Sequence, residues 1–347
     1  MTHGRVLFLA HEAERTGPPV VLLALLRWLA ERTELDVHVL FLAGGSLLSE
    51  FERVATVWRL ADVADVPRPD LVVVNTAISI QGLRSLPDWD VPVVTVVHEL
   101  DTGLVEHLPR PDYELLRRRT HGFVAPAECI AANLRDGHGV APDRVALCRE
   151  IIDEPGPSSG PGFVRRQGRP VVGGAGVVQW RKGVDLFVAL ADLVVERRDA
   201  DFVWLGGPLT GPFAEQVAAD VERAGLADRM HLVGPQPDPI DWFRTFDVFA
   251  LPTREDSMPL VLLEAAAVGV PLATFDVGCL RELVTPCGGR LAPYPRVEEL
   301  ADDVVGLLDD AEERSAAAER GRAFVRTHHA TPAAAPALWD AVVRMAR

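Results

Sequence analysis

Short, almost uninterrupted apolar runs alternate with segments of helical periodicity along the chain. In the first half these runs fall at residues 6–10, 37–43, 71–75, 91–97 and 122–126. Runs rich in Val and Leu, with few alternating polar positions, are typical of parallel strands that helices cover on both faces. An amphipathic helix with a leucine-rich face is predicted over residues 20–34. We therefore expect an α/β domain built on a parallel sheet.

The same alternation starts again after residues 153–170, a segment rich in Gly, Pro and Ser that predicts an interdomain linker. Beyond it, helices are predicted near residues 185–197, 213–224, 260–268, 297–326 and 332–347, with apolar runs between the first of them. The chain is thus predicted to contain two Rossmann-like, doubly wound domains, at residues 1–152 and 171–330. The C-terminal helix, residues 331–347, is expected to pack back on the N-terminal domain.

Length and charge narrow the possible functions. A chain of 347 residues is comfortable for two domains, and a formal net charge of −15 disfavours a binder of nucleic acid. The opening residues do not resemble a signal peptide, and no apolar stretch is long enough to span a bilayer, so we expect a cytoplasmic protein. None of the four cysteines stands in C-x-x-C spacing, which excludes a zinc knuckle.

The segment 251–271, LPTREDSMPLVLLEAAAVGVP, carries the most chemistry. A strand runs into a polar loop and then into a helix, with Asp256 on the loop and Glu264 about one turn inside the helix. Carboxylates at these places accept hydrogen bonds from sugar and ribose hydroxyls, and the free amides of the helix start face a phosphate or sugar oxygen. The alternatives are an ordinary N-cap for Asp256 and a solvated helix face for Glu264.

A second segment, 173–187, reads GGAGVVQWRKGVDLF. It places Arg181 and Lys182 between a glycine-rich loop and a helix, which suits a diphosphate. Lys182 is the only lysine among 35 basic residues, so a compact ammonium is favoured there. Neither the P-loop pattern nor the dinucleotide fingerprint is present. The alternative is a surface Arg-Lys pair beside a turn.

Two features of the N-terminal half are weaker. Thr16 and Gly17 follow the first strand in a loop that allows backbone to approach a ligand, although a plain strand-to-helix turn has the same pattern. His98 follows another strand, where it is placed to bond a sugar hydroxyl or shuttle a proton, or to serve a structural role. We interpret residues 199–201 (Asp-Ala-Asp) as a turn before a strand and His328-His329 as lacking metal-ligand spacing. Residues 117–119 are interpreted as a solvated arginine face, with a membrane-surface or acceptor role as the alternative.

Together these segments resemble the family-4 retaining glycosyltransferases of the GT-B fold. The family's E-x7-E motif reads here D-SMPLVLL-E, from Asp256 to Glu264, and RKGVDLF is similar to its KG motif. The resemblance covers most of the chain and is strongest from about 171 to 285. It implies two Rossmann-like domains facing across a cleft, with the nucleotide-sugar donor on the C-terminal domain and the acceptor on the N-terminal one.

The resemblance also implies a role for each matched residue. Glu264 would bind the ribose, Asp256 the donor sugar, and Lys182 with Arg181 the diphosphate. The other implied donor contacts are the backbone amides of Ser257, Met258 and Leu260, with Gly234 and Gln236 near the base. Thr16 and Gly17 would form the acceptor-side loop, and His98 would lie by the transferred sugar.

This sequence departs from the family pattern at three positions, and these departures affect the identity of the transferred sugar more than the class of reaction. Asp256 replaces the usual Glu, Pro259 stands where Gly is common, and Val177 where many members have Arg. The reaction implied is metal-independent, retaining transfer of a sugar from a UDP- or GDP-linked donor to a hydroxyl or amine of a small molecule, saccharide or lipid, with no cofactor. The alternatives are an epimerase or phosphorylase of the same fold, or a non-catalytic sugar-nucleotide-binding subunit. The sequence leaves the oligomeric state open.

Overall fold

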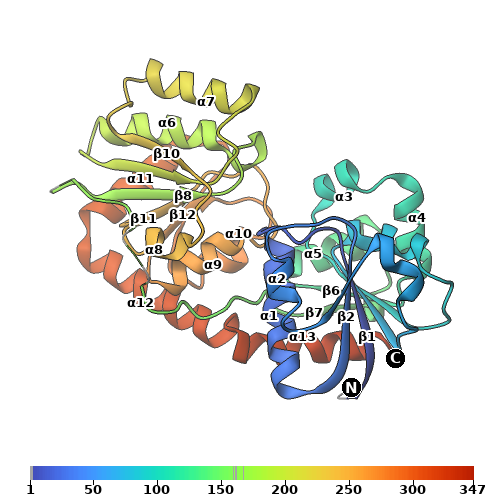
Figure 1. Ribbon diagram of the computed structural model, residues 1–347. Helices are drawn as coiled ribbons and strands as arrows, with labels where there is room; N and C mark the ends of the chain where they lie inside the picture. The colour runs from blue at the N-terminus through green and yellow to red at the C-terminus, as the bar shows by residue number, and fades with distance from the viewer. Residues whose placement is uncertain (1–2, 159, 161, 167) are drawn as a thin grey trace. The chain divides into compact units, whose positions relative to one another are not determined.

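The computed structural model describes residues 3–158, 160, 162–166 and 168–347, and the chain divides into two compact units (Figure 1). The first unit runs to Asp153 and includes His328–Arg347, and the second is Glu154–Thr327. The described residues from 153 to 170 form neither helix nor strand. No helix among the described residues combines the length and the apolar character needed to cross a bilayer.

The first unit is a seven-stranded, wholly parallel sheet in the order β3-β2-β1-β4-β5-β6-β7. Its strands are β1 (His3–Ala10), β2 (Glu34–Phe41), β3 (Thr56–Arg59), β4 (Leu71–Asn75), β5 (Val93–Val96), β6 (Gly122–Ala125) and β7 (Val145–Leu147). Its α-helices are α1 (Gly17–Arg32), α2 (Leu48–Phe51), α3 (Asp101–His107), α4 (Arg110–Arg119), α5 (Glu128–Ala132) and α13 (Thr331–Met345). Its 3₁₀-helices are η1 (Leu60–Asp65), η2 (Ala77–Ser85) and η4 (Pro142–Arg144), and η3 (Asn133–Gly137) is a π-helix. Central strands such as β4 are buried along their whole length, as the apolar runs predict.

The C-terminal helix α13 completes the first unit by packing against α1 and β6. Trp339 on this helix is almost fully buried, and its ring lies 6.5 Å from that of Phe8 on β1. The last twenty residues of the chain therefore contribute to the core formed by the first 153.

The second unit is a six-stranded parallel sheet in the order β10-β9-β8-β11-β12-β13. Its strands are β8 (Val171–Ala175), β9 (Asp201–Leu205), β10 (Met230–Gly234), β11 (Val248–Leu251), β12 (Leu272–Phe275) and β13 (Arg290–Ala292). Its helices are η5 (Trp180–Lys182), α6 (Val184–Val195), α7 (Pro212–Arg223), α8 (Pro239–Phe243), α9 (Leu260–Ala267), α10 (Leu280–Val284), α11 (Val297–Asp309) and α12 (Ala311–His328). Phe187 of α6 packs edge-on against Phe202 and Trp204 of β9, which joins helix and sheet in one core.

Several predicted boundaries differ from the structure. Helix α1 begins at Gly17 rather than residue 20, because Pro18 and Pro19 fit its first turn, where an N–H donor is not needed. It ends at Arg32, since Glu34 already pairs in β2. The helical pattern over 297–326 divides at Asp310 into α11 and α12. Strands β3, β7 and β13 were not predicted, because three or four residues at a sheet edge leave little pattern.

Candidate functional site

The loops that carry the predicted donor motifs lie along one edge of the second sheet. Strands β10, β9, β8 and β11 are adjacent and parallel, so their carboxyl ends share an edge, where open α/β sheets bind ligands. The loops are residues 176–183, 206–207, 234–237 and 252–259. Backbone hydrogen bonds join them, from Gly176 N to Leu205 O at 2.8 Å and from Gly206 N to Gly234 O at 2.9 Å.

Gly183 allows two of these loops to touch. Its φ of 69° is left-handed, and a Cβ built on it would lie 1.9 Å from the carbonyl oxygen of Pro252. Any side chain would therefore collide with backbone and strain the turn between η5 and α6. Glycine at this position allows the loop after β8 and the loop after β11 to pack this closely.

The close approach brings Lys182 and Asp256 together. Lys182 Nζ lies 2.5 Å from Asp256 Oδ2, and the two side chains are 13% and 7% exposed. Thr253 Oγ1, also buried, is 3.4 Å from the same oxygen. An ammonium and a carboxylate held this close and this far from water neutralise each other until a stronger anion competes for the lysine.

Arg181 belongs to the same cluster. Its Nη1 lies 3.6 Å from Asp256 Oδ1 and donates a hydrogen bond to Glu255 O at 2.9 Å. Two cations thus flank one carboxylate, so the cluster carries a net positive charge. The N-cap alternative for Asp256 is wrong, because Pro259 precedes the first turn of α9 and makes no side-chain cap, whereas Asp256 bonds to the cations.

A clamp that the sequence did not predict fixes the loop after β11. Arg254 donates two hydrogen bonds to the Asp185 carboxylate, at 2.9 and 2.7 Å, and its guanidinium stacks 4.5 Å from the centre of the Trp180 ring. The hydrogen bond with Asp185 raises the pKa of Arg254 above its ordinary value. Because Asp185 lies in the first turn of α6, this bidentate pair holds the Arg254 loop over the Lys182 turn.

The remaining donor-side residues lie at the start of α9. Ser257 and Met258 belong to the loop before the helix, and Leu260 is its first residue, with an amide that no i−4 carbonyl precedes in the helix. Glu264 lies in the middle of α9, half-buried beside the fully buried Leu263 and Ala265. Asp256 and Glu264 thus belong to one loop-and-helix unit, with Asp256 on the loop and Glu264 in the middle of the helix.

Gly234 and Gln236 lie farther along the same edge. Gly234 ends β10 with a φ of 82° and accepts a backbone hydrogen bond from Gly206. Gln236 follows it as a half-buried side chain. Since β9 separates β10 from β8, these two residues lie two strands away from the Lys182 turn.

On the first unit, Thr16 and Gly17 lie where the loop after β1 enters α1. Thr16 Oγ1 donates to Glu12 Oε1 at 3.0 Å, and Gly17 is the first residue of the helix. The loop crosses closely over Gly45, where a Cβ would lie 2.1 Å from the backbone of Ala13. Position 45, beneath this loop, therefore requires glycine. Gly17 has a helical conformation, which does not require glycine.

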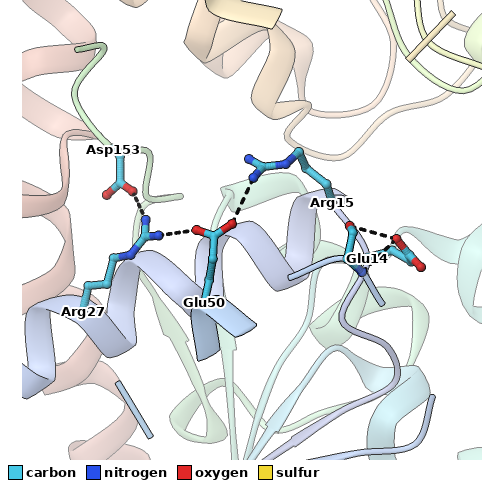
Figure 2. A network of polar contacts seen from close by, with 6 residues as sticks. Glu14, Arg15, Arg27, Glu50 and Asp153 are labelled. Carbon is cyan, nitrogen blue, oxygen red and sulfur yellow. Dashed lines mark hydrogen bonds and ion pairs between the residues drawn. The ribbon is translucent and has the colours of Figure 1, made fainter. Parts of the chain in front are cut away.

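A polar network anchors the same loop, and Figure 2 shows it. Glu50 of α2 binds Arg15 at 3.2 Å and Arg27 of α1 at 2.5 Å, and Arg27 in turn binds Asp153 at 2.9 Å. Glu14 accepts from the Ser46 hydroxyl at 3.1 Å. The network joins the loop after β1 to the segment after β7, all within the first unit.

His98 lies two residues beyond the end of β5, and its side chain is buried. Its side chain is 8% exposed, and Nδ1 lies 3.3 Å from Oε2 of Glu150, which is 4% exposed. Burial by itself lowers the pKa of His98, but the charge of Glu150, its hydrogen bond and the charge of Glu99 outweigh burial, so the pKa is raised. Sequence reasoning singled out His98 and missed its carboxylate.

The motifs to which the sequence analysis gave no role in the donor site have contacts within the fold. Asp201 begins β9 at the amino edge of the sheet, where Arg169 binds it and Asp199. His329 is buried, with Nδ1 2.9 Å from Glu150 O, and burial lowers its pKa to about 4. Arg117 and Arg118 are exposed in the last turn of α4, as expected for a solvated helix face, whereas Arg119 is half-buried and pairs with Asp88.

Within the second unit, the fold brings Arg181, Lys182 and Asp256 into one cluster and places Glu264 on the adjoining helix. It adds Arg254 and Asp185, whose pairing across 69 residues no local pattern reveals. Within the first unit it adds Glu150. The sequence does carry a signal for Glu150, because it directly precedes Ile151 and Ile152, and a carboxylate that is buried among apolar residues is almost always paired.

Two family models match the chain in succession. Residues 5–154 match "Glycosyltransferase Family 4", and residues 169–310 match "Glycosyl transferases group 1". The chain belongs to this glycosyltransferase family. The two matched segments agree with the two compact units, and the donor motifs all fall in the second segment.

Relatives with similar sequences support the same family. Over 159 residues the chain is 36% identical to the lipopolysaccharide core biosynthesis mannosyltransferase LpsB of Rhizobium meliloti, covering 44% of this chain and 45% of that protein. It is 31% identical to a D-inositol 3-phosphate glycosyltransferase of Xylanimonas cellulosilytica, covering 71% and 64%. The aligned segments thus span about half to two thirds of these relatives.

Among solved structures, Anabaena Alr3699/HepE in complex with UDP-glucose superimposes with a TM-score of 0.84 at 17% identity, over 98% of this chain and all of that one. At this identity the likeness shows the fold, which is GT-B. The predicted fold class is thereby confirmed.

Proposed function

We propose that the protein is a retaining glycosyltransferase that moves a sugar from a UDP- or GDP-linked donor to a hydroxyl or amine of an acceptor. The observation that carries this proposal is the cluster of Lys182, Arg181 and Asp256 beside the start of α9. A net positive cluster next to free helix amides suits a diphosphate. Membership of the glycosyltransferase family supports the choice of a sugar nucleotide.

Donor binding would rearrange the ion pair. The diphosphate, with more charge than one carboxylate, would draw the Lys182 ammonium from Asp256 and bind Arg181 as well. Asp256, released from the lysine, would then accept hydrogen bonds from the donor sugar. Glu264 would bind the ribose, the amides of Ser257, Met258 and Leu260 would meet sugar or phosphate oxygens, and Gly234 with Gln236 would approach the base.

The chemistry needs no protein base in this proposal. The bond between the anomeric carbon and the phosphate oxygen breaks, and the acceptor oxygen or nitrogen bonds to that carbon on the same face. The acceptor proton passes to the leaving phosphate oxygen. Lys182 and Arg181 stabilise the charge that develops on the diphosphate, which is the role that a preorganised electrostatic site fills most effectively.

The proposal includes independence from a metal ion and from any cofactor, because two side-chain cations supply the charge at the leaving group. Turnover should therefore be unchanged in an excess of EDTA. A loss of activity that Mg²⁺ or Mn²⁺ restores would contradict this part of the proposal and leave the transfer reaction standing.

The acceptor is proposed to be a small molecule, a saccharide or a lipid, bound by the first unit near Thr16, Gly17 and His98. The relatives named above act, by their names, on lipopolysaccharide core and on inositol 3-phosphate. By these names, one acceptor belongs to a saccharide-containing lipid and the other is a phosphorylated polyol. A panel of phosphorylated polyols and saccharides is thus the first set of acceptors to test.

A thermal-shift screen against UDP- and GDP-sugars tests the donor, since a ligand at a hundred times its Kd stabilises the folded state by about 2.7 kcal/mol. The donor found is then incubated with the acceptor panel, and NMR of the product gives the anomeric configuration. Inversion would overturn the retaining mechanism. A sugar altered without acceptor would favour an epimerase, and binding without turnover would favour a non-catalytic subunit.

A further inference from the structure

A buried carboxylate lies behind His98 in the first unit. Glu150 follows β7 by three residues and His98 follows β5 by two, and both strands run parallel with β6 between them. The two residues, 52 positions apart, therefore meet at the carboxyl edge of the sheet, with Nδ1 and Oε2 3.3 Å apart. This is the edge on which ligands bind in sheets of this kind.

The backbone of Glu150 is fixed by the C-terminal segment. His329 Nδ1 bonds to Glu150 O at 2.9 Å, Ile152 N donates to His329 O at 2.9 Å, and Thr331 N donates to Ile152 O at 3.0 Å. The pKa of His329 is lowered to about 4 by burial, so its ring is neutral at pH 7 and donates from Nδ1 to the carbonyl. The carboxylate beside His98 therefore rests on a rigid support.

The far side of the pair has polar atoms without partners. His98 Nε2 and Glu150 Oε1 are both buried, and neither has a hydrogen-bond partner among the described residues. Buried polar atoms in folded proteins are nearly always satisfied, so an unsatisfied pair at a ligand edge points to a group that arrives with the ligand. Because Glu150 only accepts, Nδ1 of His98 must hold the proton between them, which leaves Nε2 to meet that group.

We propose that Glu150 is a positioning residue: it fixes the ring of His98 and its Nδ1-protonated form, so that Nε2 meets a hydroxyl of the bound sugar. This inference rests on the proposed transferase function. A purely structural pair would join the β5 and β7 loops in the same way, but it would not require Nε2 to bind anything.

The charges around His98 are few. Glu150 faces its ring, and Glu99 accepts from the His98 backbone N–H at 2.9 Å and adds a weaker attraction. Burial and the charge of Glu150 raise the pKa of the buried Cys148 thiol, which the charge of Arg149 opposes. Removing the charge of Glu150 is therefore expected to lower the pKa of His98, and removing that of Glu99 to lower it less.

The first test uses NMR of labelled full-length protein and needs no turnover. In the wild type we expect Nδ1 of His98 to carry the proton, and UDP-glucose or GDP-mannose to shift the Nε2 resonance. Glu150→Gln should move the His98 pKa down, whereas Glu114→Gln, which alters an exposed pair with Arg110, should leave it unchanged. An unchanged His98 pKa in Glu150→Gln, or no shift of Nε2 with either nucleotide sugar, overturns the inference.

The second test is a double-mutant cycle on nucleoside diphosphate release. Glu150→Gln is expected to lower kcat by about tenfold or more with little change in donor KM. The reason is that a histidine without its orienting carboxylate no longer keeps the required ring orientation and tautomer. In a His98→Gln background the same change should cost nothing further. If the losses of kcat caused by Glu150→Gln and by His98→Gln are fully additive in the double variant, the inference is overturned. If Glu150→Gln does not fold, Glu150→Asp and Glu150→Ala are compared instead. Glu150→Asp keeps the charge and should retain a higher kcat than Glu150→Ala. Equal losses of kcat in the two variants overturn the inference.

The two hypotheses fail differently. If the wild type transfers no sugar from any donor in the panel, the proposed function is refuted. If transfer is normal in the wild type and equally normal in Glu150→Gln, the transferase survives and only the role of Glu150 is lost.

Discussion

Replacing Lys182 by Met tests the donor site most directly, because it removes one charge and keeps most of the side-chain volume. If Lys182 stabilises the leaving diphosphate, turnover should fall by about two to three orders of magnitude, equivalent to about 2.7–4 kcal/mol of transition-state stabilisation. The donor Kd should rise less, since most of the effect belongs to the charge that develops as the bond breaks.

The same change has a predictable cost in stability. It leaves the Asp256 side chain, 7% exposed, without the ammonium 2.5 Å away. Breaking a buried pair from one side costs about 3–5 kcal/mol, and this is an upper limit here because Arg181 remains 3.6 Å from the other carboxylate oxygen. The Tm should therefore fall by several degrees.

A double variant separates the two effects. Lys182→Met with Asp256→Asn removes the stranded charge, so the Tm should return most of the way to that of the wild type. Turnover should stay low, because the contact to the diphosphate is still missing. Nucleoside diphosphate release and thermal unfolding are measured on the same preparations, with Arg197→Met, at an exposed pair with Asp302, as the control. Folded Lys182→Met with nearly normal turnover would refute the assignment.

Further predictions follow from single contacts. Gly183→Ala should destabilise the protein by about 1–3 kcal/mol and weaken donor binding, because its left-handed φ and the Pro252 carbonyl leave no room for Cβ; a donor Kd equal to that of the wild type would argue against contact between the loops. Arg254→Lys, which loses the bidentate bond to Asp185, should raise the donor KM while Arg223→Lys at an exposed helix pair does not. The folded-state pKa of His329, about 4, lies below its ordinary 6.5, so between these values the unfolded state binds more protons and stability must rise with pH. Urea unfolding should show this rise, of about 3 kcal/mol at most, and His329→Gln should flatten it.

The sequence by itself determined the α/β class, the central strands and the loops that carry the chemistry. Apolar runs such as 71–75 are buried on both faces by any arrangement that covers a parallel sheet, so their own composition predicts a strand. The glycines and prolines that end the strands are equally local signals. For this reason Lys182 and Asp256 were predicted to lie on loops after strands, at the correct edge of their sheet.

Only the tertiary structure decided which of these residues meet. Lys182 pairs with Asp256 across 74 positions, and His98 with Glu150 across 52. Both pairs depend on strand order, and the Lys182–Asp256 pair also depends on the close backbone approach at Gly183, which no window of sequence contains. The short edge strands β3, β7 and β13 were missed for the same reason, because a three- or four-residue strand exists through the neighbour that it pairs with rather than through its own pattern.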